Sequence, residues 1–248
     1  MPDLANKTAL ITGASRGIGR ATALGLASAG ARIIVHYGRN SDAANAVVDR
    51  IRKGHGQADA ISADLAKPDG AHALAAQVRS VVGERLDILV SNAGISSATS
   101  FENITVQQFD ELFAVNVRAP YFLVQQFLPL LGSGSNIVFI SSLGARAAVG
   151  ALSAYASTKG ALNTLVKYFA AAFGTRGIRV NAVAPGVIDT DMSNFTKTED
   201  GRALVMAMQA MKGIGQPDDV ASVIAFLVSS GARWITGEVI GVDGGSKL

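Results

Sequence analysis

Tyr155 and Lys159 are the side chains of this sequence whose types and spacing best suit proton transfer. The segment between them begins a helical pattern, so a separation of four residues places both on one helix face. A free tyrosine titrates near about 10, which is too high for an efficient acid or base at neutral pH. A neighbouring ammonium group favours the phenolate, and we therefore expect Lys159 to lower the pKa of Tyr155. Ser142, thirteen residues before the tyrosine, could hydrogen-bond a substrate oxygen and stabilise charge there.

These side-chain types fit the reduction of a carbonyl group, in which the oxygen takes up a proton and the carbon receives a hydride. The tyrosine–lysine pair indicates catalysis only together with other residues, because a tyrosine and a lysine at this spacing are more often simply core and surface residues of a helix. Ser142 supplies context, since it follows an apolar run at 136–141 where a strand would end. Asn116 lies inside another helical pattern, and a satisfied interior amide is the more frequent explanation for such a residue.

The elements that must position these side chains alternate between strands and helices along the chain. Apolar, β-branched runs predict strands at 8–12, 32–36, 58–62, 87–91, 136–141, 179–184 and 239–242. Helical patterns fill the intervals at 17–29, 42–54, 69–83, 105–131, 153–175 and 217–230. Strands separated by helices pair in parallel, and near-continuous apolar strands suit a sheet covered on both faces. We predict one α/β domain over residues 1–248, with a doubly wound, seven-stranded, mostly parallel sheet whose carboxyl edge binds ligands.

A glycine-rich turn follows the first predicted strand and opens the first predicted helix. Its spacing, Gly-x-x-x-Gly-x-Gly, differs from the usual Gly-x-Gly-x-x-Gly fingerprint. Glycines here would let the backbone approach a pyrophosphate, whose charge is favoured at a helix N-terminus. Many glycine-rich segments are plain turns, but the strand–turn–helix context favours a phosphate cradle. The residues assigned to it are Gly13, Ser15, Arg16, Gly17, Ile18 and Gly19.

The end of the second predicted strand indicates which dinucleotide is bound. NAD sites usually carry a carboxylate about 20 residues beyond the glycines, to bind the ribose hydroxyls. Here the strand is followed by Tyr37, Gly38 and Arg39, without a carboxylate. Arg39 and Arg16 could together bind a 2′-phosphate through charge-assisted hydrogen bonds, which predicts NADP(H) as the cofactor. Solvated loop arginines are the alternative.

Together these motifs resemble those of the short-chain dehydrogenase/reductase family, over essentially the whole chain from Lys7 to Gly245. The resemblance implies a Rossmann fold and hydride transfer between a nicotinamide and a carbonyl or alcohol substrate. It implies that Tyr155 is the acid/base group, and the spacing to it selects Ser142 rather than Ser141. Asn116 corresponds to the family's fourth catalytic residue, which organises a water-linked proton relay to the lysine.

The resemblance also assigns cofactor contacts at the strand ends. Tyr37 falls where NAD-specific members place their acid, and Asp64-Leu65 falls where the adenine ring is contacted. Without the resemblance, helix capping explains Asp64 equally well. The contacts expected elsewhere are Asn92, Ala93 and Gly94 (with Ser91 in place of the family's first asparagine), Tyr155, Lys159, Pro185, Gly186, Ile188 and Thr190.

The segment from about 190 to 215 has no assigned element and carries several methionines. Long loops beside a site often act as lids, and methionines suit an adaptable apolar wall, so a substrate lid is one interpretation. The other is a short helix that methionines pack. In relatives, the terminal strand and two long helices build subunit contacts, so the resemblance implies a homotetramer.

Composition excludes several other classes of function. The sequence has no cysteine, and its three histidines form no ligand spacing, so we expect no metal site. The net charge of +3 is carried by dispersed side chains, which argues against nucleic-acid binding. Neither a signal-peptide pattern nor a run long enough to span a membrane is evident, so a cytoplasmic enzyme with a small-molecule partner is expected.

Within the family, the sequence most resembles the reductases of 3-oxoacyl-acyl-carrier-protein and of small ketones. Carrier-dependent members tend to show basic residues before the fifth strand, whereas residues 131–135 are uncharged here and leave Arg176 alone. A free carbonyl or alcohol substrate is therefore favoured, with a carrier-bound 3-oxoacyl chain as the alternative. A non-catalytic nucleotide-binding module is a remote third interpretation, because Asn116, Ser142, Tyr155 and Lys159 are all present.

Overall fold

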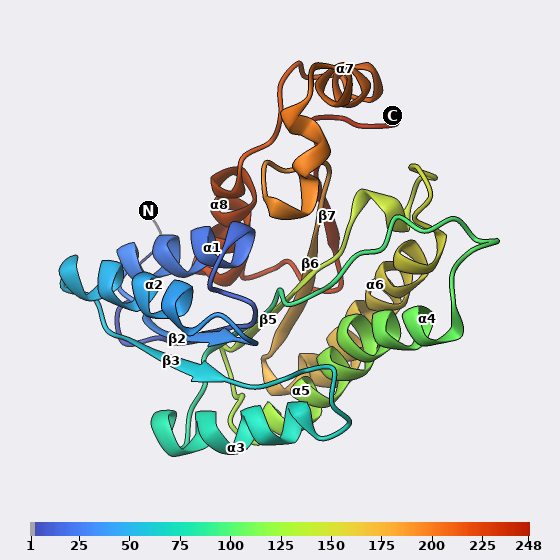
Figure 1. The fold of residues 1–248 in the computed structure, drawn as a ribbon. Helices are drawn as coiled ribbons and strands as arrows, with labels where there is room; N and C mark the ends of the chain where they lie inside the picture. The colour runs from blue at the N-terminus through green and yellow to red at the C-terminus, as the bar shows by residue number, and fades with distance from the viewer. Residues whose placement is uncertain (1–2) are drawn as a thin grey trace.

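The computed structural model describes residues 3–248, and one parallel sheet forms its centre (Figure 1). The strands are β1 (Thr8–Ile11), β2 (Arg32–Tyr37), β3 (Ala58–Ser62), β4 (Ile88–Ser91), β5 (Asn136–Ile140), β6 (Arg179–Pro185) and β7 (Val239–Val242). Their order across the sheet is β3-β2-β1-β4-β5-β6-β7, and each neighbouring pair is parallel. The predicted doubly wound sheet is therefore confirmed, and the bounds of each predicted strand shift by one residue at most.

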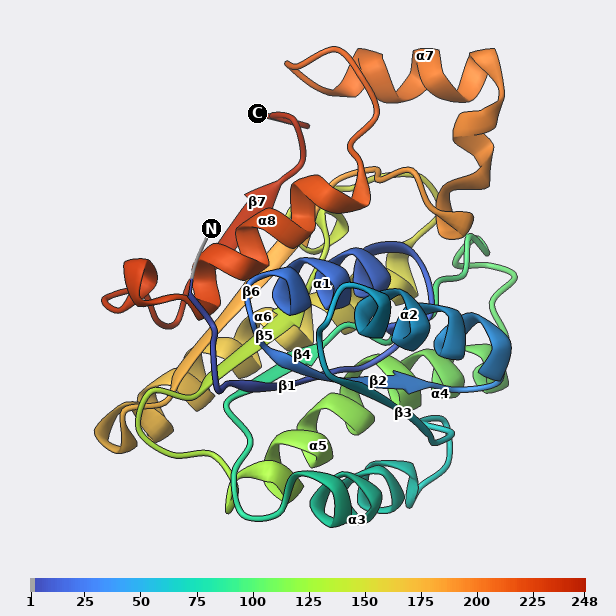
Figure 2. The ribbon, with the colours of Figure 1, turned by 90° about the vertical axis from the view of Figure 1, so that its left-hand side faces the viewer.

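Helices cover both faces of the sheet, as strands with apolar residues on both sides require (Figure 2). One face carries α1 (Gly17–Ser28), α2 (Ser41–Lys53) and α8 (Pro217–Val228). The other carries α3 (Gly70–Val82), α5 (Ala119–Phe127) and α6 (Ser153–Phe173). Successive strand residues serve the two cores in turn: Ile33 and Val35 pack on the first face and Ile34 on the second.

The helix predicted at 105–131 is interrupted in its middle. α4 (Val106–Phe113) and α5 are joined by a π-helical turn, η1 (Ala114–Arg118), which contains Asn116. Pro120, at the start of α5, has no backbone N–H to donate to the carbonyl four residues earlier. That carbonyl belongs to Asn116, so the α-helical hydrogen-bond pattern cannot continue through this position. Short π-turns inside helices occur frequently at functional sites.

Residues 191–208 are mostly helical, as the second interpretation of this segment predicted, although none of their methionines is buried. They form a 3₁₀ segment, η4 (Asp191–Lys197), and the helix α7 (Glu199–Met208), which stands away from the sheet at the top of Figures 1 and 2. Thr198 begins α7 by accepting a hydrogen bond from the Gly201 N–H at 3.2 Å. Gly201 and Val205 are the buried residues of this helix, so its sequence has little apolar periodicity from which to predict it.

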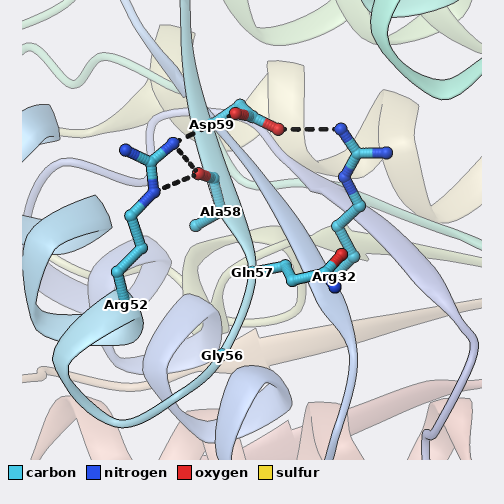
Figure 3. A pocket seen from close by; sticks show the side chains of 6 residues that line it. All are labelled: Arg32, Arg52, Gly56, Gln57, Ala58 and Asp59. Carbon is cyan, nitrogen blue, oxygen red and sulfur yellow. Dashed lines mark hydrogen bonds and ion pairs between the residues drawn. The ribbon is translucent and has the colours of Figure 1, made fainter.

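A pocket at the amino end of β2 and β3 lies away from the carboxyl edge (Figure 3). The Asp59 carboxylate there is 2.9 Å from Arg32 Nη2 and 3.2 Å from Arg52 Nη2. Arg52 also donates from Nε and Nη2 to the Ala58 carbonyl, at 3.0 and 2.7 Å. These bonds join α2 to the two strands, so the role of the cluster is structural.

Candidate active site

Tyr155 and Lys159 lie close together near the N-terminus of α6. Lys159 Nζ is 5.6 Å from the centre of the Tyr155 ring. The lysine is 4% exposed and donates to the main-chain carbonyl of Ile140, at the end of β5, over 2.8 Å. The Ser142 hydroxyl shares a hydrogen bond with the Tyr155 phenol and accepts another from the Gly144 N–H at 3.1 Å. The structure therefore brings the three predicted side chains to one edge of the sheet.

Ser141, the neighbouring hydroxyl, serves the interior of the protein. It is 2% exposed and donates to Asn163 Oδ1 over 2.6 Å. Ser142 is only partly buried and is the hydroxyl on the tyrosine side. The geometry thus favours Ser142, as the spacing to Tyr155 predicted.

Asn116 lies in the π-turn with its amide fully engaged. Its Nδ2 donates to the Ile95 carbonyl at 2.9 Å and to Thr158 Oγ1 at 3.1 Å, and its Oδ1 accepts from the Ile95 N–H at 2.9 Å. A Cβ added to Gly94 would lie 3.2 Å from Asn116 Oδ1 and 3.5 Å from Lys159 Nζ. The amide is therefore satisfied, as the structural interpretation required, and it also lies beside the lysine.

The glycine turn after β1 has a backbone that side chains would obstruct. Gly13 and Gly17 have left-handed φ angles of 63° and 54°. A Cβ on Gly19 would lie 2.4 Å from the Gly13 carbonyl oxygen and 2.5 Å from Asn92 Nδ2. Arg16 precedes α1 without a side-chain capping bond, so the first N–H groups of that helix remain available to an anion.

The turn after β4 is fastened to the glycine turn. Thr12 Oγ1 accepts from the N–H groups of Asn92 and Ala93, both at 2.9 Å. Asn92 Nδ2 donates to the carbonyls of Thr12 and Gly13, at 2.8 and 3.1 Å. The Asn92 amide therefore supports the glycine turn, and Thr12, which the sequence did not single out, joins both segments.

The tip of β2 carries Tyr37, partly buried, and Arg39, exposed. Among residues 3–248, no side-chain hydrogen bond or ion pair holds Arg39. Arg16 Nη1 is 3.1 Å from the carboxylate of Asp191, at the start of η4, and both side chains are largely exposed. Exposed pairs contribute about 0–1 kcal/mol, so a phosphate could replace that carboxylate.

Asp64 is not the cap of a helix, contrary to one of its two interpretations. Its Oδ1 accepts from the Ala66 N–H at 3.0 Å and so closes a local turn, while Asp69 precedes α3. Leu65 is 6% exposed and belongs to the core below the sheet.

The segment after β6 lies against the glycine turn. Pro185 ends β6, and Gly186 is so close to the chain that follows β7 that a Cβ would lie 2.9 Å from Asp243. Ile188 is buried, and the Thr190 methyl would be 3.3 Å from a Cβ on Gly17. The cofactor contacts predicted after β6 therefore reach the predicted phosphate cradle.

Comparison with known proteins places this arrangement in a family. The profile of a family described as enoyl-(acyl carrier protein) reductase matches residues 13–247. A short-chain dehydrogenase from Burkholderia cenocepacia, solved in complex with NADP, is 39% identical, has a TM-score of 0.94 and covers 99% of each chain. The chain belongs to the short-chain dehydrogenase/reductase family.

Two further relatives of this dehydrogenase/reductase carry named activities. The versicolorin reductase of Emericella nidulans is 38% identical over 98% of this chain and 96% of its own. The angucycline C-6 ketoreductase LanV, solved with bound NADP, is 39% identical, with a TM-score of 0.94 over 100% of this chain and 98% of its own. The protein is accordingly an NADP(H)-dependent oxidoreductase that acts on carbonyl groups.

The residues of this dehydrogenase/reductase fit its cofactor. The start of α1 offers unpaired N–H groups to a pyrophosphate, and the absence of a side chain at Gly94 leaves space beside Lys159 Nζ, which would lie 3.5 Å from a Cβ there. Arg39 supplies an exposed cation just after β2, where Tyr37 stands in place of a carboxylate, whereas Arg16 in the glycine turn is paired with Asp191.

The pKa values of the reductase's tyrosine and lysine differ from the expectation. Burial raises the pKa of Tyr155 above its ordinary value of 10.0, although the hydrogen bond with Ser142 acts in the opposite direction. Burial also lowers the pKa of Lys159 from 10.5 to about 8. The predicted lowering of the Tyr155 pKa by Lys159 is therefore wrong for the protein by itself, because the loss of water around the phenol outweighs the one contribution that lowers the pKa, the hydrogen bond with Ser142.

Some groups that hold the site residues of the reductase in place were not indicated by the sequence. Thr158 accepts from Asn116 Nδ2 and donates to the Tyr155 carbonyl at 2.6 Å, so it links the π-turn to α6. The Ile140 carbonyl, which holds Lys159, is a main-chain group that no side-chain pattern reveals. A polar residue one position before Lys159, on a buried helix face, is the one signal that could have indicated Thr158.

The described residues of the reductase also bear on metal binding and on membrane insertion. Within residues 3–248, no group of three or more His, Cys, Asp or Glu side chains could hold a metal ion. Across the same part of the chain, no helix has the length and apolar character needed to cross a membrane.

Proposed function

We propose that this oxidoreductase reduces a free cyclic ketone with NADPH, and that Tyr155 donates the proton. The observation that carries the proposal is the Tyr155–Ser142 hydrogen bond beside a buried Lys159. The phenol is protonated at neutral pH, since its ordinary pKa is 10.0 and burial raises it further, and a protonated phenol is the form that can donate to a ketone oxygen.

In the proposed mechanism, Ser142 and Tyr155 both hydrogen-bond the ketone oxygen. Ser142 stabilises negative charge as it develops, and Tyr155 transfers its phenolic proton to that oxygen. The Lys159 ammonium then stabilises the phenolate by its charge. Asn116 holds the Ile95 main chain beside Lys159, which supports its predicted role in returning a proton through water to the lysine.

NADPH supplies the hydride when it is bound. The residues we propose to hold it are Gly13, Ser15, Arg16, Gly17, Ile18, Gly19, Tyr37, Arg39, Asp64, Leu65, Asn92, Ala93, Gly94, Tyr155, Lys159, Pro185, Gly186, Ile188 and Thr190. These side chains and turns lie at or just beyond the carboxyl ends of the strands, where ligands of doubly wound sheets bind.

Arg39→Ala is expected to weaken the binding of NADPH by about 1–3 kcal/mol, which raises its Kd roughly five- to 150-fold, because one charge-assisted hydrogen bond is lost. NADH, which lacks the 2′-phosphate, should bind almost unchanged. Fluorescence titration of both dinucleotides measures the difference. Arg50→Ala, an exposed arginine on α2, is the matched control for loss of charge. Equal weakening of NADPH and NADH would contradict the assignment of Arg39.

The surroundings of Arg176, before the amino end of β6, support a free substrate over a carrier-bound one. Arg176, the one cation that the sequence left near residues 131–135, donates to the carbonyls of Leu128 and Leu131, both at 2.9 Å. Arg176 therefore has a role in the fold, and although its guanidinium is exposed, residues 131–135 add no second cation for an acidic carrier. The versicolorin and angucycline reductases named above support a cyclic ketone.

The exposed apolar residues of the segment 190–215 support a substrate lid. Met192, Phe195, Leu204 and Met211 are each about half exposed or more. Their side chains would be covered if α7 approached an apolar substrate, and such closure would exclude water from the site. We place this lid within a single domain that comprises the whole chain.

A screen of ketones with NADPH tests the proposed function. The panel contains 1-tetralone as a cyclic ketone, ethyl acetoacetate as a linear 3-oxoester, and an acetoacetyl chain on acyl carrier protein. We expect the highest kcat/KM with the cyclic ketone. Preference for the carrier-bound chain would establish the alternative substrate class, and no NADPH oxidation with any compound would favour a non-catalytic module.

We also propose a cytoplasmic homotetramer. A groove between α4, α5 and α6 is lined by Phe113, Val117, Tyr121 and Leu165, and Trp234 near β7 is 95% exposed. Such apolar surfaces mark contact sites, and they lie on the elements from which the sequence resemblance predicted subunit contacts. Light scattering should give four times the mass of one chain.

A further inference from the structure

His36 is a buried titratable residue that the proposed mechanism does not use. It lies on β2 between β1 and β3, and its side chain is almost inaccessible, at 2% exposed. Its Nδ1 accepts from the Gly13 N–H at 3.1 Å, and its Nε2 lies 3.1 Å from the Ala63 carbonyl oxygen. The imidazole therefore bridges the turns that follow the two neighbouring strands.

The two partners determine the protonation state of the ring. A backbone N–H can only donate, so Nδ1 must be the unprotonated acceptor, and a carbonyl can only accept, so Nε2 must carry the proton. An imidazolium would turn one N–H toward another. Burial agrees with this assignment, since it lowers the pKa of His36 to about 4.

The glycine turn is held on each side of Gly13. The His36 side chain accepts a hydrogen bond from the Gly13 N–H, and the His36 carbonyl accepts one from the Ala14 N–H at 2.9 Å. On the other side, Asn92 Nδ2 donates to the Gly13 carbonyl. With these groups occupied, the peptide units around a left-handed Gly13 are fixed, and the N–H groups at the start of α1 are left for an anion.

The second hydrogen bond of His36, to the Ala63 carbonyl, reaches the turn that carries the residues proposed for the adenine ring. Ala63 immediately precedes Asp64 and Leu65, the residues proposed for the adenine ring, and its own N–H donates to the Tyr37 carbonyl at 3.2 Å. One imidazole thus joins the glycine turn at Gly13, which we call the pyrophosphate turn, to the turn at residues 63–65, which we call the adenine turn. Any change in its length or bonding would change the spacing between the two.

We propose that His36 is a positioning residue that sets the spacing between the pyrophosphate turn and the adenine turn, and so determines dinucleotide affinity. This inference rests on the proposed cofactor contacts. It predicts that His36 acts on NADPH and NADH alike, because it does not reach the 2′-phosphate position that is assigned to Arg39.

Three substitutions separate the two bonds. His36→Leu removes both, His36→Asn can keep an acceptor at the Nδ1 position for Gly13, and His36→Gln can keep a donor at the Nε2 position for Ala63. We expect His36→Leu to raise the Kd of NADPH and of NADH by on the order of tenfold, which is the scale of one unsatisfied buried hydrogen bond. Each partial replacement should recover part of that loss, and fluorescence titration measures it.

Asn136→Leu is the control for simple destabilisation. Asn136 is buried at the amino end of β5 and donates to the carbonyls of Gly134 and Val228. Its replacement should lower Tm while the Kd of NADPH stays within twofold or so of the parent value. Equal weakening of NADPH by Asn136→Leu and His36→Leu would mean that loss of stability, not positioning, explains the effect.

Two further results would overturn the inference while leaving the proposed function intact. One is a folded His36→Leu protein that binds NADPH as the parent does. The other, which remains decisive if that variant does not fold, is ¹⁵N NMR of the parent at pH 7 that shows Nδ1 protonated. Failure of the parent protein to bind NADPH would instead contradict the cofactor contacts themselves.

Discussion

Tyr155→Phe is expected to lower kcat for ketone reduction by about 10²–10⁴-fold, the usual contribution of a positioned acid or base. The substitution removes only the hydroxyl that is hydrogen-bonded to Ser142 and leaves the ring 5.6 Å from Lys159 Nζ. NADPH affinity should therefore change little, because the aromatic surface remains. Single-turnover oxidation of NADPH, followed by absorbance, separates the chemical step from cofactor binding.

Tyr168→Phe is the matched control for this loss of a hydroxyl. Tyr168 lies on the same helix but is 72% exposed, so its phenol meets solvent instead of the site. Its replacement should leave kcat within about twofold of the parent value. A kcat for Tyr155→Phe that is also within twofold would remove Tyr155 from the chemistry and leave the enzyme without its proposed acid.

Protonation of Tyr155 also bears on the direction of the reaction. A phenol whose pKa is raised by burial is protonated at neutral pH and so holds the proton that a ketone oxygen needs, but it is a weaker acid until a nearby cation stabilises the phenolate. Oxidation of an alcohol needs the phenolate, which is scarce until the pH is high. At neutral pH the phenol is therefore in the form that ketone reduction requires.

Much of the fold could be predicted because its signals are local. Strands such as β5 are nearly continuous apolar runs, and glycine turns and helix starts depend on residues only a few positions apart. Ser142 could be distinguished from Ser141 because its distance in sequence from Tyr155 reflects a fixed path from the end of β5 into α6. Regular elements thus turn sequence spacing into position.

The remainder depends on contacts between distant segments. His36 meets Gly13 and Ala63, and Lys159 meets the carbonyl of Ile140, and none of these pairs has a sequence pattern. Desolvation follows from the packing of many residues at once, which is why the direction of the Tyr155 pKa shift was predicted wrongly. The π-turn at Asn116 had a local cause in Pro120, but a helical pattern does not distinguish a kinked from a regular helix.

Lys159→Met is expected to abolish most activity. At neutral pH the same substitution should make the protein more stable than the parent, and this advantage should shrink at alkaline pH. Lys159 is 4% exposed, and its Nζ has a carbonyl as hydrogen-bond acceptor. Among residues 3–248, no carboxylate forms an ion pair with it. Lowering its pKa from 10.5 to about 8 costs about 3 kcal/mol of folding free energy below pH 8, at roughly 1.4 kcal/mol per pKa unit. The lost bond to Ile140 offsets about 1–3 kcal/mol of the gain.

The pH dependence of the Lys159→Met effect isolates the charge from the lost hydrogen bond. Between pH 8 and 10.5 the unfolded parent protein binds more protons than the folded protein, so its stability rises with pH across that window. Methionine does not titrate, and the advantage of the variant should therefore shrink by about 2 kcal/mol from pH 7 to pH 9.5. Denaturant unfolding at the two pH values measures this change, with Lys167→Met, an exposed lysine of α6, as the control. An advantage that is the same at both pH values would mean that Lys159 holds its proton throughout, and that the ammonium is stabilised by groups other than the Ile140 carbonyl.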